Sequence, residues 1–351
     1  MQCAVFGASG YAGAELLRVL ARHPNISVAF VGGKGSVGRA VGDLYEAAPP
    51  DVASLPYLDI DDLIQKIETE RVPLVFLALP HGESQNLVPK LMEVTDHIVD
   101  LAADFRIKDP ELYKLWYGEE HSCPTLLKSA VYGMPELSRD GIAGAKLVAV
   151  PGCYPTAATL AMKPLVNRGF VGKRVVVDAA SGVSGAGRSL KPEYLAMSVE
   201  EDFRAYGLLR HRHTVEMEHN LDLSVLFTPH LAPMKRGILA TCYLEPTQSF
   251  LDETSDLSQQ EVQDLLYELY QDHYSSDHFV RCSTRPPGTS SVYGTNNVAL
   301  YATFDRRTRR FVALGALDNL TKGAAGQAVQ CANIVLGYDE DEGLKEMGVW
   351  P

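Results

Sequence analysis

A short strand, a glycine-rich turn and a helix follow one another at the start of this chain. The segment QCAVFGASGYAGAELLRVLARHP opens with apolar residues, carries glycines at positions 7, 10 and 13, and continues with leucines at helical spacing. A dinucleotide pyrophosphate binds at such a junction, because the N–H groups at the start of the helix point toward it. Gly7 then permits the tight turn, Gly10 the approach of the pyrophosphate, and Gly13 the packing of the helix on the sheet. A purely structural turn is the alternative interpretation.

The second predicted strand, ISVAFVGGKG, indicates which dinucleotide the turn prefers. A site for NAD(H) usually places Asp or Glu at the end of this strand, where the carboxylate binds the ribose hydroxyls. Here the strand ends in two glycines and Lys34, followed by Ser36 and Arg39 without a carboxylate. A cation fits a 2′-phosphate, so NADP(H) is favoured over NAD(H), unless Lys34 is a solvated surface charge. The remaining predicted cofactor contacts of the first turn are Ser9, Tyr11 and Ala12.

The rest of the amino-terminal half alternates between apolar strands and helices. The strands are PLVFLALPHGES, HIVDLAADFR and AKLVAVPGC, and SQNLVPKLMEV is typical of a helix despite its proline. Continuous apolar strands separated by helices predict a parallel sheet with both faces covered. Ligands bind at the carboxyl ends of such strands, so we expect His81, Asp104, Arg106 and Cys153 to converge on one crevice.

Beyond residue 165 the chain becomes rich in β-structure. The segments KRVVVDAASGVSGAGRS, ILATCYLEP, NNVALYATFD and RRFVALGAL predict an antiparallel or mixed sheet, with a helix that begins near Ser258. The expected fold is therefore α/β, with a Rossmann-type parallel-sheet domain and a second α+β domain. The Rossmann domain is predicted over 1–152, completed by a returning helical segment over 318–351. The catalytic and association domain is predicted over 153–317.

Charge and cysteine usage exclude several classes of protein. The net charge is −12 with a pI near 5.3, which argues against nucleic acid as a partner. The six cysteines are scattered without CxxC or Cys/His spacing, so neither a zinc site nor a disulfide framework is expected. No secretory signal or membrane span is expected either. The predicted location is the cytoplasm, or an organelle interior if a transit peptide has been removed.

One cysteine stands at the predicted start of a helix. In VPGCYPTAATL, the residues 155–162 predict a helix with Pro155 at its first position. The thiol of Cys153 would then lie near free backbone N–H groups, which stabilise a thiolate and make it nucleophilic. A small buried apolar residue is the alternative interpretation.

Three polar clusters lie in the second half of the chain. SGVSGAGRS (181–189) follows a strand and would offer backbone N–H groups to a phosphate or carboxamide, unless it is a flexible hairpin. LLRHRHTVEMEHN (208–220) holds the densest group of histidines, and a nucleophilic cysteine needs a nearby proton acceptor. HLAPMKRGILAT (230–241) is predicted to end a loop with Lys235 and Arg236 before a strand. Two cations there suit an anionic substrate and are equally ordinary on a surface.

These segments together resemble the N-acetyl-γ-glutamyl-phosphate reductases, an arginine-biosynthesis family of the semialdehyde dehydrogenase superfamily. The resemblance runs from residue 1 to about 335 through nine motifs: GASGYAGAEL, LALPHG, DLAADFR, VYGMPEL, VPGCYPTAATL, SGVSGAGR, HRHTVEME, PMKRGILAT and DNLTKGAAGQAVQ. One departure is visible, because the family's histidine motif usually continues with Pro-Glu-Ile and this chain has Val215-Glu216-Met217.

The resemblance implies NADPH-dependent reduction of an acyl phosphate to an aldehyde through a cysteine thioester. It makes Cys153 the nucleophile and His213 the general acid/base, with His211 as the alternative and Glu216 orienting the imidazole. The β-rich second domain suggests association through its sheet, as a homodimer or homotetramer. Arg106 and Arg236 are the candidates for binding the substrate's anionic groups. The residues expected near the nicotinamide are Ser184, Gly185 and Asn319.

Three other functions remain open at this point. An aspartate-semialdehyde dehydrogenase shares the fold and chemistry but has a different histidine context. A lysine-pathway reductase would act on a substrate one methylene longer or carrier-bound, and a methylene is worth only about 1–3 kcal/mol of discrimination. A redox-sensing NADP-binding regulator would keep the glycine turn and Cys153 but would not need the histidines or the cations.

Overall fold

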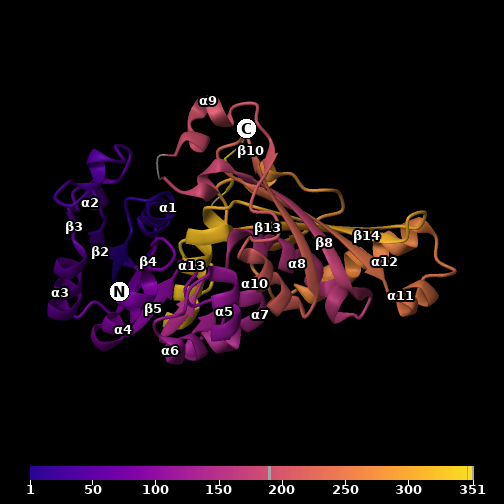
Figure 1. The fold of residues 1–351 in the computed structure, drawn as a ribbon, viewed down its shortest axis with the longest axis horizontal. Helices are drawn as coiled ribbons and strands as arrows, with labels where there is room; N and C mark the ends of the chain where they lie inside the picture. Colours follow the sequence, from indigo (N-terminus) through magenta and orange to yellow (C-terminus); the bar gives the residue numbers. More distant parts are fainter. Residues whose placement is uncertain (189–190, 346, 350–351) are drawn as a thin grey trace. The chain divides into compact units, whose positions relative to one another are not determined.

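The computed structural model describes residues 1–188, 191–345 and 347–349, and it divides into two compact units. The first unit comprises Met1–Pro151 and Ala324–Glu346, and the second comprises Gly152–Gly323 and Met347–Pro351. Figure 1 follows the chain through both, from the indigo amino terminus to the yellow carboxyl terminus.

The first unit is built on a seven-stranded sheet in which every strand pair is parallel. The strand order is β3-β2-β1-β4-β5-β7-β6, so the order reverses between β1 and β4, which is where ligands bind in open α/β sheets. The strands are β1 (Gln2–Phe6), β2 (Ser27–Gly32), β3 (Tyr57–Leu58), β4 (Leu74–Leu77), β5 (His97–Asp100), β6 (Val131–Tyr132) and β7 (Leu147–Ala149). The helices are α1 (Tyr11–Leu20), α2 (Pro50–Ala53), α3 (Ile60–Glu70), α4 (Ser84–Val94), α5 (Pro110–Tyr117), α6 (Pro124–Ser129), α7 (Pro135–Ile142) and α13 (Gly326–Leu336).

Continuous apolar strands explain why helices cover both faces of this sheet. All four residues of β4 are fully buried, and α1 buries Leu16, Leu17 and Leu20 on one stripe. The helix α4 tolerates Pro89 because the carbonyl of Gln85, which loses its helical donor, accepts a hydrogen bond from the Cys123 thiol. The predicted strands and the predicted helix over 84–94 are confirmed.

The second unit is built on a mixed seven-stranded sheet of order β12-β13-β14-β11-β8-β10-β9. Antiparallel pairs predominate, and β8 with β10 and β12 with β13 are parallel. The strands are β8 (Val171–Gly182), β9 (Arg204–Ala205), β10 (Ser224–Ala232), β11 (Ile238–Pro246), β12 (Val280–Cys282), β13 (Val298–Asp305) and β14 (Arg310–Leu317). The helices are α8 (Cys153–Asn167), α9 (Ala196–Val199), α10 (His213–Leu221), α11 (Gln248–Glu253) and α12 (Gln259–His273).

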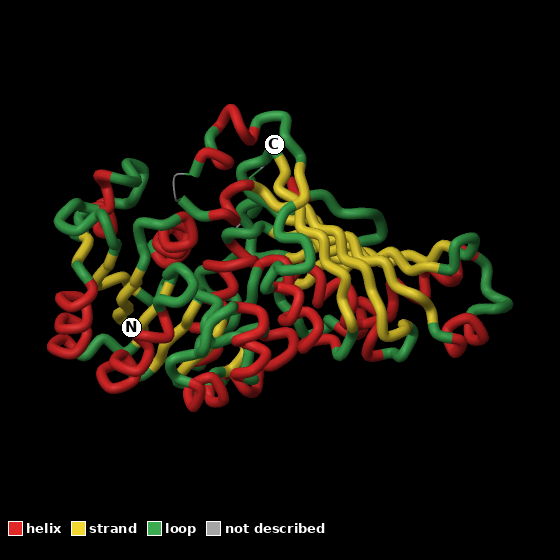
Figure 2. Tube along the Cα trace, viewed as in Figure 1, coloured by secondary structure: helices red, strands yellow, loops and turns green. Residues whose placement is uncertain are grey.

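The helices α8 and α12 pack against the sheet of the second unit, whose long twisted strands are drawn in yellow in Figure 2. The expected mixed sheet is confirmed, and so is the helix near Ser258, whose side chain caps α12 by accepting from the N–H of Glu261. The loop predicted over the start of 230–241 is wrong, because His230–Ala232 continue β10 alongside β8. Parallel pairing with β8 overrides the local proline and glycine signals there.

The helix that carries Cys153 begins two residues earlier than its proline indicates. Gly152 is the N-cap and Cys153 the first helical residue, so Pro155 stands third rather than first. Proline is tolerated there as well, because none of the first four N–H groups of a helix has an intrahelical partner. A second proline, Pro164, lies inside α8, and the Leu160 carbonyl that it leaves without a helical donor accepts from the hydroxyl of Tyr274 at 2.7 Å.

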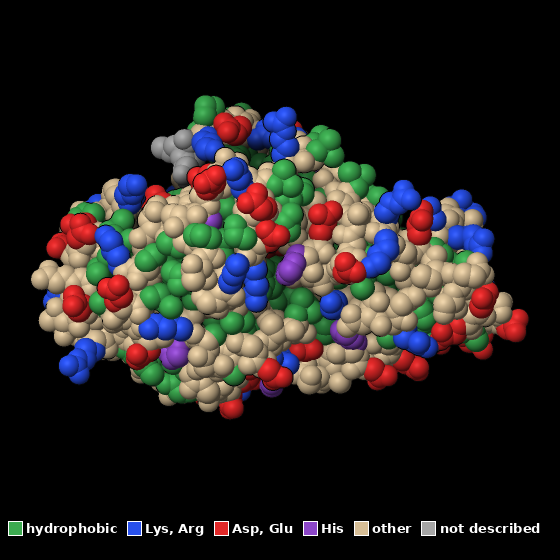
Figure 3. Space-filling view, turned by 60° about the horizontal axis from the view of Figure 1, so that its bottom comes forward, with side chains coloured by type: hydrophobic (Ala, Val, Ile, Leu, Met, Phe, Trp, Pro, Cys, Tyr) green, Lys and Arg blue, Asp and Glu red, His purple; other side chains and the backbone are tan. Residues whose placement is uncertain are grey.

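The described helices include none that is long and apolar enough to cross a membrane. On the face drawn in Figure 3, basic and acidic side chains are interspersed rather than gathered by sign.

Candidate active site

The glycine turn after β1 is shaped by two of its three glycines. Gly7 has φ +74°, and a Cβ added to it would lie 2.2 Å from the carbonyl oxygen of Ala78. A Cβ on Gly13 would lie 2.3 Å from the Gly7 oxygen. Gly10 is different, because its Cβ would meet only the Gly7 oxygen, at 3.5 Å. The fold itself therefore demands Gly7 and Gly13, whereas Gly10 leaves open the space in front of the first turn of α1.

The start of α1 is free of side-chain caps. Gly10 is its N-cap and makes no side-chain hydrogen bond, so the first N–H groups of the helix lack the usual capping oxygen. The Ser9 carbonyl is held by the Tyr45 hydroxyl at 2.8 Å, which fixes the turn. Tyr11 and Ala12 follow as the first helical residues, with Tyr11 exposed.

The loop after β2 presents a cation to solvent. The Lys34 side chain is 81% exposed, and its Nζ lies 3.4 Å from Glu83 Oε1. An ion pair with this exposure is worth about 0–1 kcal/mol, so it does not hold Lys34 firmly. Ser36 is buried, and its N–H donates to the Gly33 carbonyl, while Arg39 donates to the Asp43 carbonyl.

His81, in the loop that follows β4, contacts the buried carboxylate of Asp104. Nδ1 of His81 lies 2.6 Å from Oδ1 of the fully buried Asp104. Burial alone would raise the pKa of Asp104, but hydrogen bonds from His81 and from the N–H groups of Gly82 and Gln85 lower it to about 2. Arg106 lies in the same unit, largely buried, and donates to the Leu101 carbonyl at 2.9 Å. Cys153 belongs to the second unit, so the expected convergence of all four residues stays a prediction.

Cys153 lies at the amino terminus of α8, where backbone N–H groups favour a negative charge. Its side chain is partly exposed. The residue before it is fixed from α10, because the N–H of Gly152 donates to Oε2 of Glu216 at 3.0 Å. Glu216 is itself buried. A buried carboxylate therefore anchors the backbone that leads into the cysteine.

The imidazole of His213 packs directly on Gly152. A Cβ added to Gly152 would lie 2.4 Å from Nε2 of His213, so only glycine admits the ring there. His213 is the first residue of α10 and Glu216 lies one turn later, which brings Nε2 to 4.0 Å from Glu216 Oε1. The helix spacing i, i+3 thus gathers an imidazole and a carboxylate beside the residue that precedes Cys153.

His211 occupies a different environment two residues away. Its Nδ1 accepts a hydrogen bond from the N–H of His213 at 3.2 Å, and its ring packs edge-on against Tyr154 and Phe227. Burial, with the nearby Arg212 charge, lowers the pKa of His211 to about 4. At neutral pH this ring is therefore neutral, with its proton on Nε2.

Two tyrosines beside the histidines were not among the residues predicted to be functional. The hydroxyl of Tyr206 donates to that of Tyr154, which in turn donates to the His230 carbonyl at 3.1 Å. Burial raises the pKa of both hydroxyls, so they stay protonated. The position of Tyr154 directly after Cys153 was the only signal for them in the sequence.

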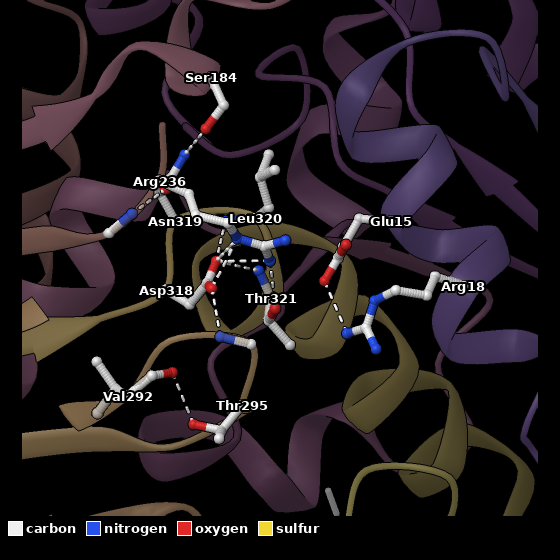
Figure 4. Close-up of polar contacts among 12 residues, drawn as sticks. Glu15, Arg18, Ser184, Arg236, Val292, Thr295, Asp318, Asn319, Leu320 and Thr321 are labelled. Atoms are coloured by element: carbon white, nitrogen blue, oxygen red, sulfur yellow. Dashed lines mark hydrogen bonds and ion pairs between the residues drawn. The ribbon is translucent and has the colours of Figure 1, made fainter. Parts of the chain in front are cut away.

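Arg236 is paired with a buried carboxylate. Its Nε and Nη2 donate to Oδ1 of Asp318 at 3.0 and 2.8 Å, and Nη2 also donates to the Thr321 hydroxyl. Figure 4 shows this pair, with Asn319 and Ser184 above it. Asp318 has no exposed surface and was not among the residues predicted to be functional.

The residues expected near the nicotinamide lie together in the second unit. Asn319 Nδ2 donates to the Ser184 hydroxyl at 2.9 Å, and its Oδ1 accepts from the N–H of Gly237 at 2.6 Å. Gly185 adjoins them, because a Cβ on it would lie 3.7 Å from Asn319 Nδ2. The loop 181–189 does not offer all its N–H groups to a ligand as expected. Those of Gly182, Val183 and Ser184 donate to the carbonyls of residues 237, 234 and 235, and Ser189 lies outside the described residues.

Comparison with known proteins identifies both units. Residues 2–145 match the semialdehyde dehydrogenase NAD binding domain, and residues 153–319 match the semialdehyde dehydrogenase dimerisation domain. The solved structures that this chain resembles include aspartate semialdehyde dehydrogenase II from Vibrio cholerae. The TM-score is 0.70 at 16% identity, and the match covers 96% of this chain and 98% of that one. Aspartate semialdehyde dehydrogenase with NADP from Candida albicans gives a TM-score of 0.67 at 15% identity, covering 95% of this chain and 97% of that one. At these identities the likeness confirms the fold.

Sequence relatives are more specific. N-acetyl-gamma-glutamyl-phosphate reductase from Dehalococcoides mccartyi is 41% identical, with 99% of this chain and 98% of the relative covered. The proteins of the same name from Pelobacter propionicus and Desulforudis audaxviator are 41% and 42% identical, with 100% and 99% of both chains covered. The chain therefore belongs to the N-acetyl-γ-glutamyl-phosphate reductase family of the semialdehyde dehydrogenases.

Proposed function

We propose that this protein reduces N-acetyl-γ-glutamyl phosphate to N-acetylglutamate 5-semialdehyde and phosphate in arginine biosynthesis, with NADPH as reductant. The observation that carries the proposal is the joint placement of Cys153, His213 and Glu216 around Gly152. A thiol thus stands at a helix amino terminus, and an imidazole and a carboxylate are held beside the residue that precedes it. That arrangement suits an acyl-transfer nucleophile with its proton acceptor and orienting group.

The first step is acyl transfer to the thiol. The thiolate of Cys153 attacks the acyl carbon, the C–O bond to phosphate breaks, and inorganic phosphate leaves with the electron pair. The N–H groups at the start of α8 stabilise the thiolate before the attack. A nicotinamide bound at this site would supply the hydride that reduces the resulting thioester. The thiohemiacetal on Cys153 then collapses to the aldehyde and restores the thiolate.

His213 is the residue that we assign to proton transfer. It lies against the backbone of Gly152 and within 4.0 Å of Glu216, whereas His211 is held neutral by burial. His213 would take the thiol proton, give a proton to the oxyanion that hydride addition creates, and take that proton back as the thiohemiacetal collapses to the aldehyde. Glu216 would orient its ring and stabilise the imidazolium. His211 would line the substrate pocket.

The first unit is proposed to bind the dinucleotide and the second to carry the nucleophile and the substrate contacts. The uncapped start of α1 and the open space at Gly10 fit a pyrophosphate. The pyrophosphate contacts would come from the turn comprising Gly7, Ser9, Gly10, Tyr11, Ala12 and Gly13. Ser184, Gly185 and Asn319 would hold the nicotinamide, with the Asn319 amide already oriented by its two hydrogen bonds.

Specificity for the 2′-phosphate is proposed to come from Lys34 with Ser36. Lys34→Asp should weaken NADPH binding strongly and NADH binding much less, because a carboxylate repels the 2′-phosphate and can bind a 2′-hydroxyl. Dissociation constants for both cofactors give the measurement. Lys90→Asp, at an exposed lysine of the same unit, is the control and should change neither. An unchanged preference in Lys34→Asp would show that the phosphate is read elsewhere, with Arg39 as the next candidate.

Arg106 and Arg236 are proposed to bind the anionic groups of the substrate. Both guanidinium groups already have protein acceptors, the Leu101 carbonyl for Arg106 and the Asp318 carboxylate for Arg236. These contacts fix the side chains in advance, which lowers the entropy cost of binding an anion.

The proposed location of the protein remains the cytoplasm or an organelle interior.

The second unit is proposed to associate with another copy through the open face of its sheet. Leu226, Val176 and Tyr243 are register neighbours on β10, β8 and β11, and they are 51%, 37% and 40% exposed. An apolar row across three strands of a family's dimerisation domain fits a homodimer, and a second interface would make a homotetramer.

Val176→Glu should therefore dissociate the assembly, because it places a charge at the centre of the apolar row. Sedimentation velocity at micromolar concentration should show a smaller species than the wild type. Leu115→Glu, at a leucine of the first unit that is 74% exposed, should leave the sedimentation unchanged. Wild-type association of the Val176→Glu variant would place the interface elsewhere.

A steady-state assay in the reverse direction tests the proposed function as a whole. With NADP and phosphate, N-acetylglutamate semialdehyde should give the highest kcat/KM. The non-acetylated aspartate semialdehyde and the homologue one methylene longer should be poorer substrates. A preference for either of those would reassign the substrate, and no turnover with any of them would favour a regulator.

A further inference from the structure

A single π-helical turn lies against the cysteine. Thr321–Ala325 form this turn before α13, and the N–H of Gly323 donates to the carbonyl of Asp318, five residues earlier, at 3.0 Å. Turns of this kind are rare and occur frequently at functional sites. None of the residues proposed for catalysis or binding lies in it.

Gly323 is the point of contact between this turn and Cys153. A Cβ added to Gly323 would lie 2.7 Å from the Cβ of Cys153, closer than real Cβ atoms approach other atoms. It would also lie 3.2 Å from Leu317 Cδ1 and 3.4 Å from the Asp318 carbonyl oxygen. The conformation of Gly323 does not require glycine, since its φ is not positive. The close approach of Cys153 is what excludes a side chain.

The turn cannot easily move away from Cys153. The buried carboxylate of Asp318 accepts from the N–H groups of Gly294, Leu320 and Thr321, and it pairs with Arg236. Lys322 is fully buried with its Nζ 5.7 Å from the ring centre of Phe279. These contacts fix the residues that precede Gly323.

Cys153 is fixed from its other side as well. The N–H of Gly152 is bound to Glu216, and the ring of His213 fills the space where a Cβ of Gly152 would stand. The cysteine is thus held between the backbone of the π-helical turn and the histidine helix α10.

Resting on the nucleophilic role proposed for Cys153, we propose that Gly323 is a positioning residue that sets the place of this thiol beside His213. Gly323 would act through Cys153 and not on the substrate itself. Because Gly323 has no side chain, the first turn of α8 can pack directly against the π-helical turn. A methyl group at 323 would push Cys153, because Asp318 and Lys322 hold the turn itself in place.

Gly323→Ala tests the proposal with two readouts. The value of kcat should fall by on the order of 10²-fold with little change in KM, since small misplacements of a reacting group have effects of that size. The pH midpoint for alkylation of Cys153 by iodoacetamide should shift upward, because the displaced thiolate loses the helix N–H groups and His213. The second readout needs no substrate, so it remains valid even if Cys153→Ser disproves the catalytic role. Gly288→Ala, whose Cβ would have only Ser290 Oγ at 3.9 Å, is the matched control and should behave as wild type.

Stability measurements keep the proposal testable if Gly323→Ala does not fold. Cys153→Gly removes the Cβ that the new methyl group would meet, so Gly323→Ala should lower Tm much less when it is added to Cys153→Gly than when it is added to the wild type. An equal loss of Tm in both backgrounds would overturn the proposal, because the collision would then involve another residue. A folded Gly323→Ala with an unchanged alkylation profile would overturn it too, whatever happens to kcat.

Discussion

Cys153→Ser should lose almost all turnover while it folds and binds the dinucleotide as the wild type does. A serine hydroxyl in the same place has no comparable anion near neutral pH, and the N–H groups at the start of α8 do not bring its pKa into range. The side chain is similar in volume, so the packing against Gly323 should be kept. Steady-state rates, dinucleotide dissociation constants and Tm of the variant and the wild type make the comparison.

Chemical labelling supplies the companion test. Cys153 should react faster with iodoacetamide than the other five cysteines, and the acyl phosphate should protect it. Cys3 and Cys242 are the internal controls, because burial raises the pKa of the Cys3 thiol to about 12 and also raises that of Cys242. Turnover of Cys153→Ser within about tenfold of wild type would remove Cys153 from its role.

His213→Asn should lower kcat by on the order of 10²–10⁴-fold with much less effect on substrate affinity. A group that acts only in the transition state changes the rate without changing ground-state binding. The pH–rate profile should also lose one limb in this variant. That limb cannot belong to His211, whose pKa of about 4 keeps it neutral throughout the neutral range.

His211→Asn is the matched substitution two residues away. It should mainly raise KM, because His211 packs among Tyr154, Tyr206 and Phe227 and has no contact with Glu216 among the described interactions. The lowered pKa of His211 also predicts how the free energy of unfolding changes with pH. Since the pKa of His211 is depressed on folding, protonation favours the unfolded chain, so the wild type should lose stability as pH falls below about 6.5. His211→Asn should lose less than the wild type, because burial also lowers the pKa values of His23, His121 and His273. Rate loss and the missing limb in His211→Asn would reverse the two roles.

The spacing of apolar residues and the positions of glycine and proline were enough to predict the fold. The apolar strands and the glycine turn define the parallel sheet, because each of their signals depends only on neighbouring residues. Gly7 and Gly13 are required by contacts with Ala78 and with the turn itself, which is what a tight strand-to-helix junction entails. The segment 230–232 was predicted wrongly because its strand character comes from pairing with β8, a partner distant in the sequence.

The site could be predicted only in part, since its finer features arise from tertiary contacts. Nothing local distinguishes His211 from His213, and only packing shows that one is buried among aromatic rings and the other lies on Gly152. The pairing of Arg236 with Asp318 spans 82 residues of sequence and has no local signal. The contact between Gly323 and Cys153 likewise joins two motifs that lie far apart in the sequence, and neither carries a local signal for it.

Trapping the acyl-enzyme tests the central claim most directly. The protein is incubated with N-acetyl-γ-glutamyl phosphate in the absence of reduced cofactor, quenched in acid, and analysed by peptide mass spectrometry. An acyl group should be found on the peptide that contains Cys153, should be removed by neutral hydroxylamine, and should be absent from Cys153→Ser. An acyl group on another residue, or none in a preparation that is fully active, would contradict the thioester mechanism.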